Sequence, residues 1–231
     1  MTIFVKNKFL TMAQSASWTL EAWAEALPVY NQILSHPFIK ELAAGTLAPE
    51  VFDRYLAQDE LYIGNYGRQM FELAELIDDP AAHDMFVEFA REGIEGEKAM
   101  HALLIERFGI DTKVLPSPIT ADYNAHTQAA LATGSKEVGL AAMLPCMWVY
   151  NEVGKYILSI ASVDGNPYAE WIREYGNEAF TEGVNAVLQL ADSYAAATTP
   201  EIRKRMTAEY LAATRYEYYF WDSGYFGKDN R

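Results

Sequence analysis

Residues 139–158 place the only cysteine of the chain, Cys146, inside an apolar run, and this stretch constrains the rest of the molecule most. Written as an α-helix, it puts Cys146 and Tyr150 four residues apart on one face, with Met143 and Val153 on the same side. That face would offer a thiol and a phenol to the interior. A lone cysteine in such a place can also be an ordinary small core residue, so its role depends on which other groups reach it.

Apolar residues recur at helical spacing along most of the chain. Asp79-Pro80 and Thr199-Pro200 are typical of helix starts, whereas Pro28 is expected to kink the first helix or to end it early. No run of alternating residues lies between hairpin turns, so we predict an all-α bundle of seven or more helices. The expected helices cover residues 18–34, 38–44, a long segment from Pro49, 80–108, 119–131, 139–158, 168–194 and a last segment from Pro200.

Charge and cysteine content exclude several classes of partner. The chain has 231 residues and a net charge of -14, with no basic stripe that could attract nucleic acid or anionic lipid. The uncharged run around Cys146 is shorter than the roughly 20 residues that cross a bilayer. One cysteine cannot form an internal disulfide, which favours the cytoplasm. We predict a flexible leader at residues 1–15 and a single helical-bundle domain at residues 16–231.

Asp59 is an unusual member of the long helix that begins at Pro49. Helical spacing places it on an otherwise apolar stripe with Phe52, Tyr55 and Tyr62. A carboxylate in that position must be hydrogen-bonded if it is buried. A slight rotation of the helix would instead leave it at the surface, and the spacing alone leaves both possibilities open.

Glu217 is the second unusual carboxyl group, because it lies within the aromatic run YEYYFW of residues 216–221. Shielding by aromatic rings disfavours the charged form of a carboxyl group, so its pKa would rise and it could both give and take a proton. The alternative is that Glu217 points outward while its neighbours pack inward. Three predicted helices therefore each carry a reactive group beside a ring: Asp59 with Tyr62, Cys146 with Tyr150, and Glu217 with Phe220.

Such a set suits a flat, nitrogen-bearing heterocycle: rings stack on it, a carboxylate binds its amino group, a thiol attacks it and an acid protonates a ring nitrogen. Several motifs together resemble the TenA family, also called thiaminase II or aminopyrimidine aminohydrolase, in the branch that retains the cysteine. The motifs are HPF at 36–38, FDRYLAQDELYI at 52–63, PSP with TADYNAH at 116–126, LPCMWVYNEVG at 144–154 and YEYYFWD at 216–222.

The resemblance implies a heme-oxygenase-like helical bundle without heme, usually a homotetramer, that needs no metal or organic cofactor. The implied reaction is hydrolysis at the methylene carbon on C5 of a 4-amino-2-methylpyrimidine. The substrate would be the 5-aminomethyl compound, which loses ammonia, or thiamin, which loses its thiazole. Both reactions give the hydroxymethylpyrimidine used in thiamin salvage.

The resemblance also assigns roles to residues of this chain. Cys146 corresponds to the nucleophile that adds to the ring beside N1, and Glu217 to the acid/base that protonates N1. Asp59 would hold the 4-amino group and N3. The remaining implied positions stack on the ring or bond to the thiol and carboxyl groups, and they are Tyr62, Tyr123, Tyr150, Tyr175 and Phe220.

Two other functions compete with this interpretation. Glu97 and His101, four residues apart, could be ligands of a non-heme di-iron oxidase, although a second Glu/His pair is missing from the sequence. A pair on the surface or in the core of the helix explains them as well. The third possibility is a non-catalytic protein that binds an aminopyrimidine while Cys146 only packs.

Overall fold

The computed structural model describes residues 17–229, and every regular element in that range is an α-helix, as predicted. The nine described helices are α1 (Trp18–Ser35), α2 (Pro37–Ala44), α3 (Pro49–Ala74), α4 (Pro80–Phe108), α5 (Pro118–Leu131), α6 (Lys136–Ile160), α7 (Ala169–Tyr175), α8 (Glu178–Ala197) and α9 (Pro200–Phe226). The leader predicted at residues 1–15 lies outside the described residues.

The predicted start signals lie at the observed helix starts. The Asp79 side chain accepts a hydrogen bond from the backbone N–H of Ala82, and Pro80 follows in the first turn of α4. Thr199 caps α9 in the same way, with Pro200 next to it. A proline suits this position because the first N–H groups of a helix have no partner within the helix.

Helix α1 does not end early at Pro28 but continues to Ser35. A proline inside a helix leaves the carbonyl group four residues before it without a hydrogen bond. Here both Pro28 and Ala24 lie on the exposed side of α1, so water can reach the free carbonyl group. The exposed position explains why the helix tolerates the proline.

The single helix predicted for residues 168–194 is wrong, because the chain breaks at Gly176 and Asn177 between α7 and α8. The Asn177 side chain accepts from the backbone N–H of Phe180 at 2.7 Å and so begins α8. A side chain at position 176 would require Leu158 to move, since an added Cβ atom would lie 2.2 Å from Cδ1 of that residue. The junction therefore packs closely against α6, and apolar spacing does not reveal the break.

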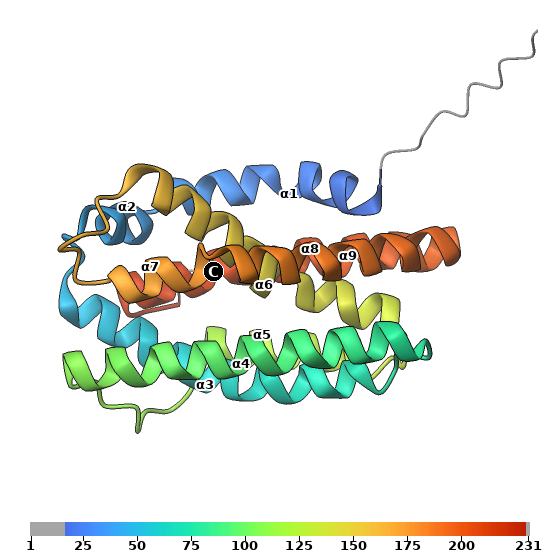
Figure 1. The fold of residues 1–231 in the computed structure, drawn as a ribbon, viewed down its shortest axis with the longest axis horizontal. Helices are drawn as coiled ribbons and strands as arrows, with labels where there is room; N and C mark the ends of the chain where they lie inside the picture. Colours follow the sequence, from blue (N-terminus) through green and yellow to red (C-terminus); the bar gives the residue numbers. More distant parts are fainter. Residues whose placement is uncertain (1–16, 230–231) are drawn as a thin grey trace, which may run out of the picture.

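Helix α6, which carries Cys146, runs obliquely through the bundle (Figure 1). It packs on α9 most extensively and also contacts α2, α3, α5, α7 and α8. Helices α3 and α4 lie side by side along one edge of the bundle. Within the described part of the chain, no helix is both long and apolar enough to cross a membrane.

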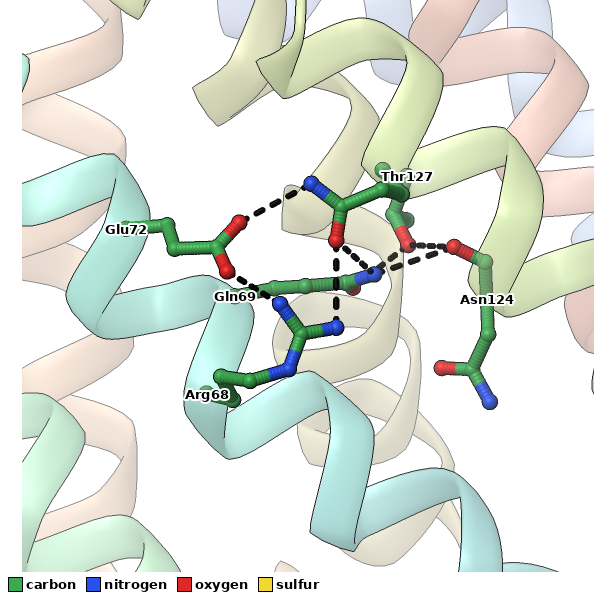
Figure 2. A network of polar contacts seen from close by, with 6 residues as sticks. Arg68, Gln69, Glu72, Asn124 and Thr127 are labelled. Atoms are coloured by element: carbon green, nitrogen blue, oxygen red, sulfur yellow. Dashed lines mark hydrogen bonds and ion pairs between the residues drawn. The ribbon is translucent and has the colours of Figure 1, made fainter.

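A polar network ties α3 to α5 and so fixes the two helices that carry Asp59 and Tyr123 (Figure 2). The buried Gln69 amide donates to the backbone oxygen of Asn124 at 3.0 Å. The Thr127 hydroxyl donates to the Gln69 side-chain oxygen at 2.6 Å. Buried polar groups of this kind contribute most when every member has a partner.

Replacing Gln69 with leucine should lower the stability of the folded chain by about 1–3 kcal/mol, because buried partners lose their hydrogen bonds. For a chain of this size each kcal/mol lowers Tm by about 2–4 °C, which thermal unfolding followed by circular dichroism would detect. Asn65→Ala, on the exposed side of the same helix, is the matched control. Equal Tm values for the two variants would contradict the role of the network.

Candidate active site

Helices α3, α4, α6 and α7 surround a cavity of about 50 Å³. A water molecule needs roughly 10–15 Å³ by this measure, so the cavity holds a few waters, and a substituted aromatic ring would have to push its walls apart. The polar side chains in its lining are Asp59, Tyr66, Glu97, Cys146, Tyr150, Glu174 and Tyr175.

Cys146 lies on α6 with 8% of its surface exposed. Burial raises the pKa of its thiol well above the ordinary range, and the negative charges of Glu217, Glu97 and Asp59 raise it further. The thiol therefore keeps its proton at neutral pH, and a proton acceptor must act before or while the sulfur attacks a substrate.

Glu217 lies on α9 and is almost completely buried, so its outward orientation is ruled out. The Tyr123 hydroxyl of α5 donates to its Oε1 at 2.5 Å. The pKa of Glu217 is raised to about 8. Burial is the largest cause and the charges of Asp59 and Glu97 add to it, whereas the hydrogen bond from Tyr123 opposes the rise. At neutral pH the carboxyl group holds a proton that it can transfer.

Asp59 is also buried, and it has the partners that a buried carboxylate needs. The Tyr55 hydroxyl donates to its Oδ2 at 3.0 Å, and Nε2 of His101 lies 3.4 Å from the same oxygen. Nδ1 of His101 is 2.7 Å from Glu60. Burial lowers the pKa of His101, but the ion pair with Asp59 and the other carboxylates nearby outweigh this effect and raise the pKa to about 9. The imidazolium ion thus pairs with Asp59.

Tyr175 reaches the cavity because α7 approaches α6 very closely. A Cβ atom at Gly154 would lie 2.5 Å from the backbone carbon of Tyr175, so only glycine allows the contact. The Asn151 amide donates to the Tyr175 backbone oxygen at 3.2 Å. The Tyr175 ring packs beside Tyr150, with centroids 4.8 Å apart, and its hydroxyl donates to Glu97.

The structure divides the predicted site residues into two groups. Those that line the cavity are Asp59, Cys146, Tyr150 and Tyr175. Those that form a neighbouring buried layer are Tyr62, Tyr123, Glu217 and Phe220. In that layer the Tyr62 ring stacks on Tyr123 with centroids 4.8 Å apart, and it meets Phe220 at 5.8 Å. The Tyr62 hydroxyl is buried without a hydrogen-bond partner among the described residues.

Sequence reasoning missed several residues of the cavity and its support. Glu97 faces the cavity and His101 is the cation beside Asp59, so they are more than a surface or core pair. Tyr66 lines the cavity and donates to the backbone oxygen of Met143 at 2.9 Å. The stripe of tyrosines around Asp59, namely Tyr55, Tyr62 and Tyr66, was the available signal for the α3 side of the cavity. Spacing within α3 does not predict which residues of α4 it contacts.

Asp59, Glu97 and His101 place one donor atom each within 4.8 Å of one another, which is close enough for a single cation. A buried ion pair between His101 and Asp59 accounts for the same proximity. Across residues 17–229 no second group of this kind accompanies it, whereas a di-iron site would need one.

The described helices and this cavity define a helical-bundle protein with a buried thiol between acidic groups. A domain from Shewanella denitrificans described as having a heme oxygenase-like fold matches it with a TM-score of 0.70 at 18% identity, covering 89% of this chain and 91% of that one. A TenA homologue from Pyrococcus furiosus matches with a TM-score of 0.85 at 22% identity, covering 90% and 100%. The fold is therefore heme-oxygenase-like, as predicted.

The sequence comparison gives the family. The profile of the TENA/THI-4/PQQC family matches residues 23–226, so the chain belongs to this family. It is also 31% identical over 195 residues to the aminopyrimidine aminohydrolase of Bacillus subtilis, covering 82% of each chain. The family resemblance seen in the motifs is confirmed.

The raised pKa of Cys146 predicts that alkylation by iodoacetamide is slow at neutral pH. Its rate should still be rising with pH where a free cysteine, with a pKa of about 8.5, has levelled off. Because the chain has one cysteine, the mass of the intact protein reports this site alone. The same protein unfolded in urea is the control, and a folded-state rate that levels off at or below the pH of this control would contradict the assignment.

Proposed function

We propose that the protein is an aminopyrimidine aminohydrolase of thiamin salvage. It converts 4-amino-5-aminomethyl-2-methylpyrimidine to the hydroxymethyl compound and ammonia, and it also cleaves thiamin at the same methylene carbon. The observation that carries the proposal is that Cys146 and Asp59 line one cavity, while the buried Glu217 is near enough for its charge to raise the pKa of the Cys146 thiol. Family membership and the name of the Bacillus subtilis relative support the substrate class.

The first step joins the thiol to the ring. Asp59 accepts a hydrogen bond from the 4-amino group of the substrate, which orients the pyrimidine. The sulfur of Cys146 bonds to C6 while Glu217 gives its proton to N1 and takes the thiol proton. The net change is addition of S–H across the C6–N1 double bond, which ends the aromaticity of the ring.

The second step releases the group on the methylene carbon. The electron pair of the 4-amino nitrogen moves through C4 and C5, an exocyclic double bond forms, and the leaving group departs with its electron pair while Asp59 takes an amino proton. The oxygen of water then bonds to the methylene carbon while that water loses one proton to a basic group of the cavity or to solvent. Asp59 returns its proton to the 4-amino nitrogen, and expulsion of sulfur restores the ring. The N1 proton passes back through Glu217 to Cys146. The route uses side chains alone.

We further propose a homotetramer in the cytoplasm, in which residues 16–231 form a single domain. Family resemblance supports the tetramer, and the single cysteine supports a reducing compartment. Light scattering at four times the chain mass would support the tetramer, and one cooperative thermal transition would support a single domain.

The test of the function is a rate assay of the metal-stripped protein on the aminomethylpyrimidine and on thiamin, following the hydroxymethyl product. We expect turnover of both, and we expect Cys146→Ser to lower it by orders of magnitude, as deletion of a nucleophile does elsewhere. Glu201→Gln, on the exposed first turn of α9, should leave the rate unchanged. Near-normal rates in Cys146→Ser would contradict the covalent route.

Two outcomes of this assay would favour the competing functions. Turnover that appears only when iron and oxygen are added back would support an oxidase. Tight binding of the aminopyrimidine with no turnover of either compound would support a binding protein.

Glu217 also predicts the pH dependence of the reaction. Its pKa is raised to about 8, so the acid form persists through neutral pH, and the rate should fall as the pH rises through that value. Glu217→Gln should lower turnover by about 10²–10⁴-fold, the usual range for a general acid. With thiamin as the substrate, the residual activity should lose the fall near pH 8. An unchanged pH profile in this variant would assign that titration to another group.

A further inference from the structure

We propose that Glu97 serves the leaving group: it shares a proton with the amine on the C5 methylene and keeps that nitrogen protonated while the C–N bond breaks. It then takes a proton from the water that replaces the amine. This inference rests on the proposed function, since it concerns the same cavity and the same substrate. It gives Glu97 a role that is separate from those of Cys146 and Glu217.

The chemistry of the substrate places the methylene carbon near Glu97. On the pyrimidine, C5 lies between C4, whose amino group Asp59 binds, and C6, which Cys146 attacks. The substituent of C5 therefore emerges between Asp59 and Cys146. Glu97 lines the same cavity from the facing helix α4, and its donor atom lies within 4.8 Å of those of Asp59 and His101.

The hydroxyl groups of the cavity already have partners. Tyr66 donates to the backbone oxygen of Met143, and the Tyr150 hydroxyl lies 3.1 Å from that of Tyr55. Tyr175 donates to Oε1 of Glu97 itself, which leaves Oε2 of that carboxyl group to meet a ligand. Of the two glutamates in the lining, Glu97 is the one with a donor atom within 4.8 Å of that of Asp59, so it is the one placed to serve the methylene substituent.

The face of α4 that carries Glu97 leads outward from the cavity. His101, Glu97, Gly93 and Phe89 follow one another at four-residue spacing, so they lie along one side of the helix. His101 is buried against Asp59, whereas Gly93 and Phe89 also line a second pocket of about 450 Å³. A group leaving the methylene would move along this face, past Glu97, into the larger pocket.

The second pocket suits a positively charged group. Its acidic residues are Glu88, Glu92, Glu174 and Glu182. Glu174 lines both pockets, and a Cβ atom at Gly96 would lie 2.7 Å from its carboxylate oxygen, so the glycine makes room for this carboxylate. Both substrates carry a cation on the methylene carbon, an ammonium group or a thiazolium ring, and carboxylates attract it.

The raised pKa of Glu97 is consistent with a proton shared between its carboxyl group and the amine of the substrate. Burial raises its pKa, the charge of Asp59 raises it further, and His101 and the Tyr175 bond oppose the rise. A carboxyl group poised in this way exchanges a proton with an amine at little cost. The amine departs as ammonia with the electron pair of the C–N bond, Glu97 is left as a carboxylate, and the incoming water protonates it again. Glu97 then holds the same proton count at the end of the cycle as at the start.

The two substrates allow a sharp test, because the thiazole of thiamin leaves with its electron pair and needs no proton. The values of kcat/KM include the steps up to release of the leaving group. Glu97→Gln should therefore lower kcat/KM for the aminomethylpyrimidine by about 10²-fold or more. For thiamin the loss in kcat/KM should be smaller by about tenfold or more, because the thiazole leaves without a proton from Glu97.

Two control variants keep the test decisive. Glu97→Asp retains a carboxyl group and should keep the substrate ratio near that of the unmodified protein, and Glu95→Gln, on the exposed side of α4, should change neither rate. Equal losses on both substrates, or no loss in Glu97→Gln, would overturn the role of Glu97 while leaving the function in place. Absence of turnover in the unmodified protein would overturn the proposed function itself, and the role of Glu97 with it.

Discussion

Burial of acidic groups around one cavity is the constraint on which the rest of this structure depends. The negative charges of three carboxyl groups, Asp59, Glu97 and Glu217, raise the pKa of the Cys146 thiol. His101 is the positively charged partner of Asp59. Uncompensated charges in such a place would cost several kcal/mol each. The structure meets this constraint in two ways: an imidazolium ion pairs with Asp59, and the other groups hold their protons.

The helices around the cavity can be understood as supports for this arrangement. Asp59 comes from α3, His101 from α4 and Cys146 from α6, so their geometry depends on how the helices pack rather than on any single loop. Gln69 fixes α5 on α3, and Gly154 lets α7 approach α6. Sites built on regular elements hold their geometry more precisely than sites on loops, and here each support is a buried contact between two helices.

Local signals in the sequence predicted most of the fold and part of the site. Asp79-Pro80 begins α4 because capping is a property of neighbouring residues, and the reactive groups Asp59, Cys146 and Glu217 stood out by their apolar surroundings. The break at Gly176 and the position of Glu97 could not be found in this way. Both depend on contacts between different helices: Leu158 of α6 fills the space at Gly176, and Asp59 of α3 approaches α4.

A resting site with little net charge also explains how a protonated thiol can act as a nucleophile. A permanent thiolate among carboxylates would be strongly disfavoured, so sulfur and ring must exchange a proton as the bond forms. In the proposed route, Glu217, held by the Tyr123 hydroxyl at 2.5 Å, would give a proton to N1 and receive one from sulfur without any change in the total charge of the site. On this proposal a buried Cys146 can still react, but only with a substrate whose ring accepts a proton as the sulfur bonds to it.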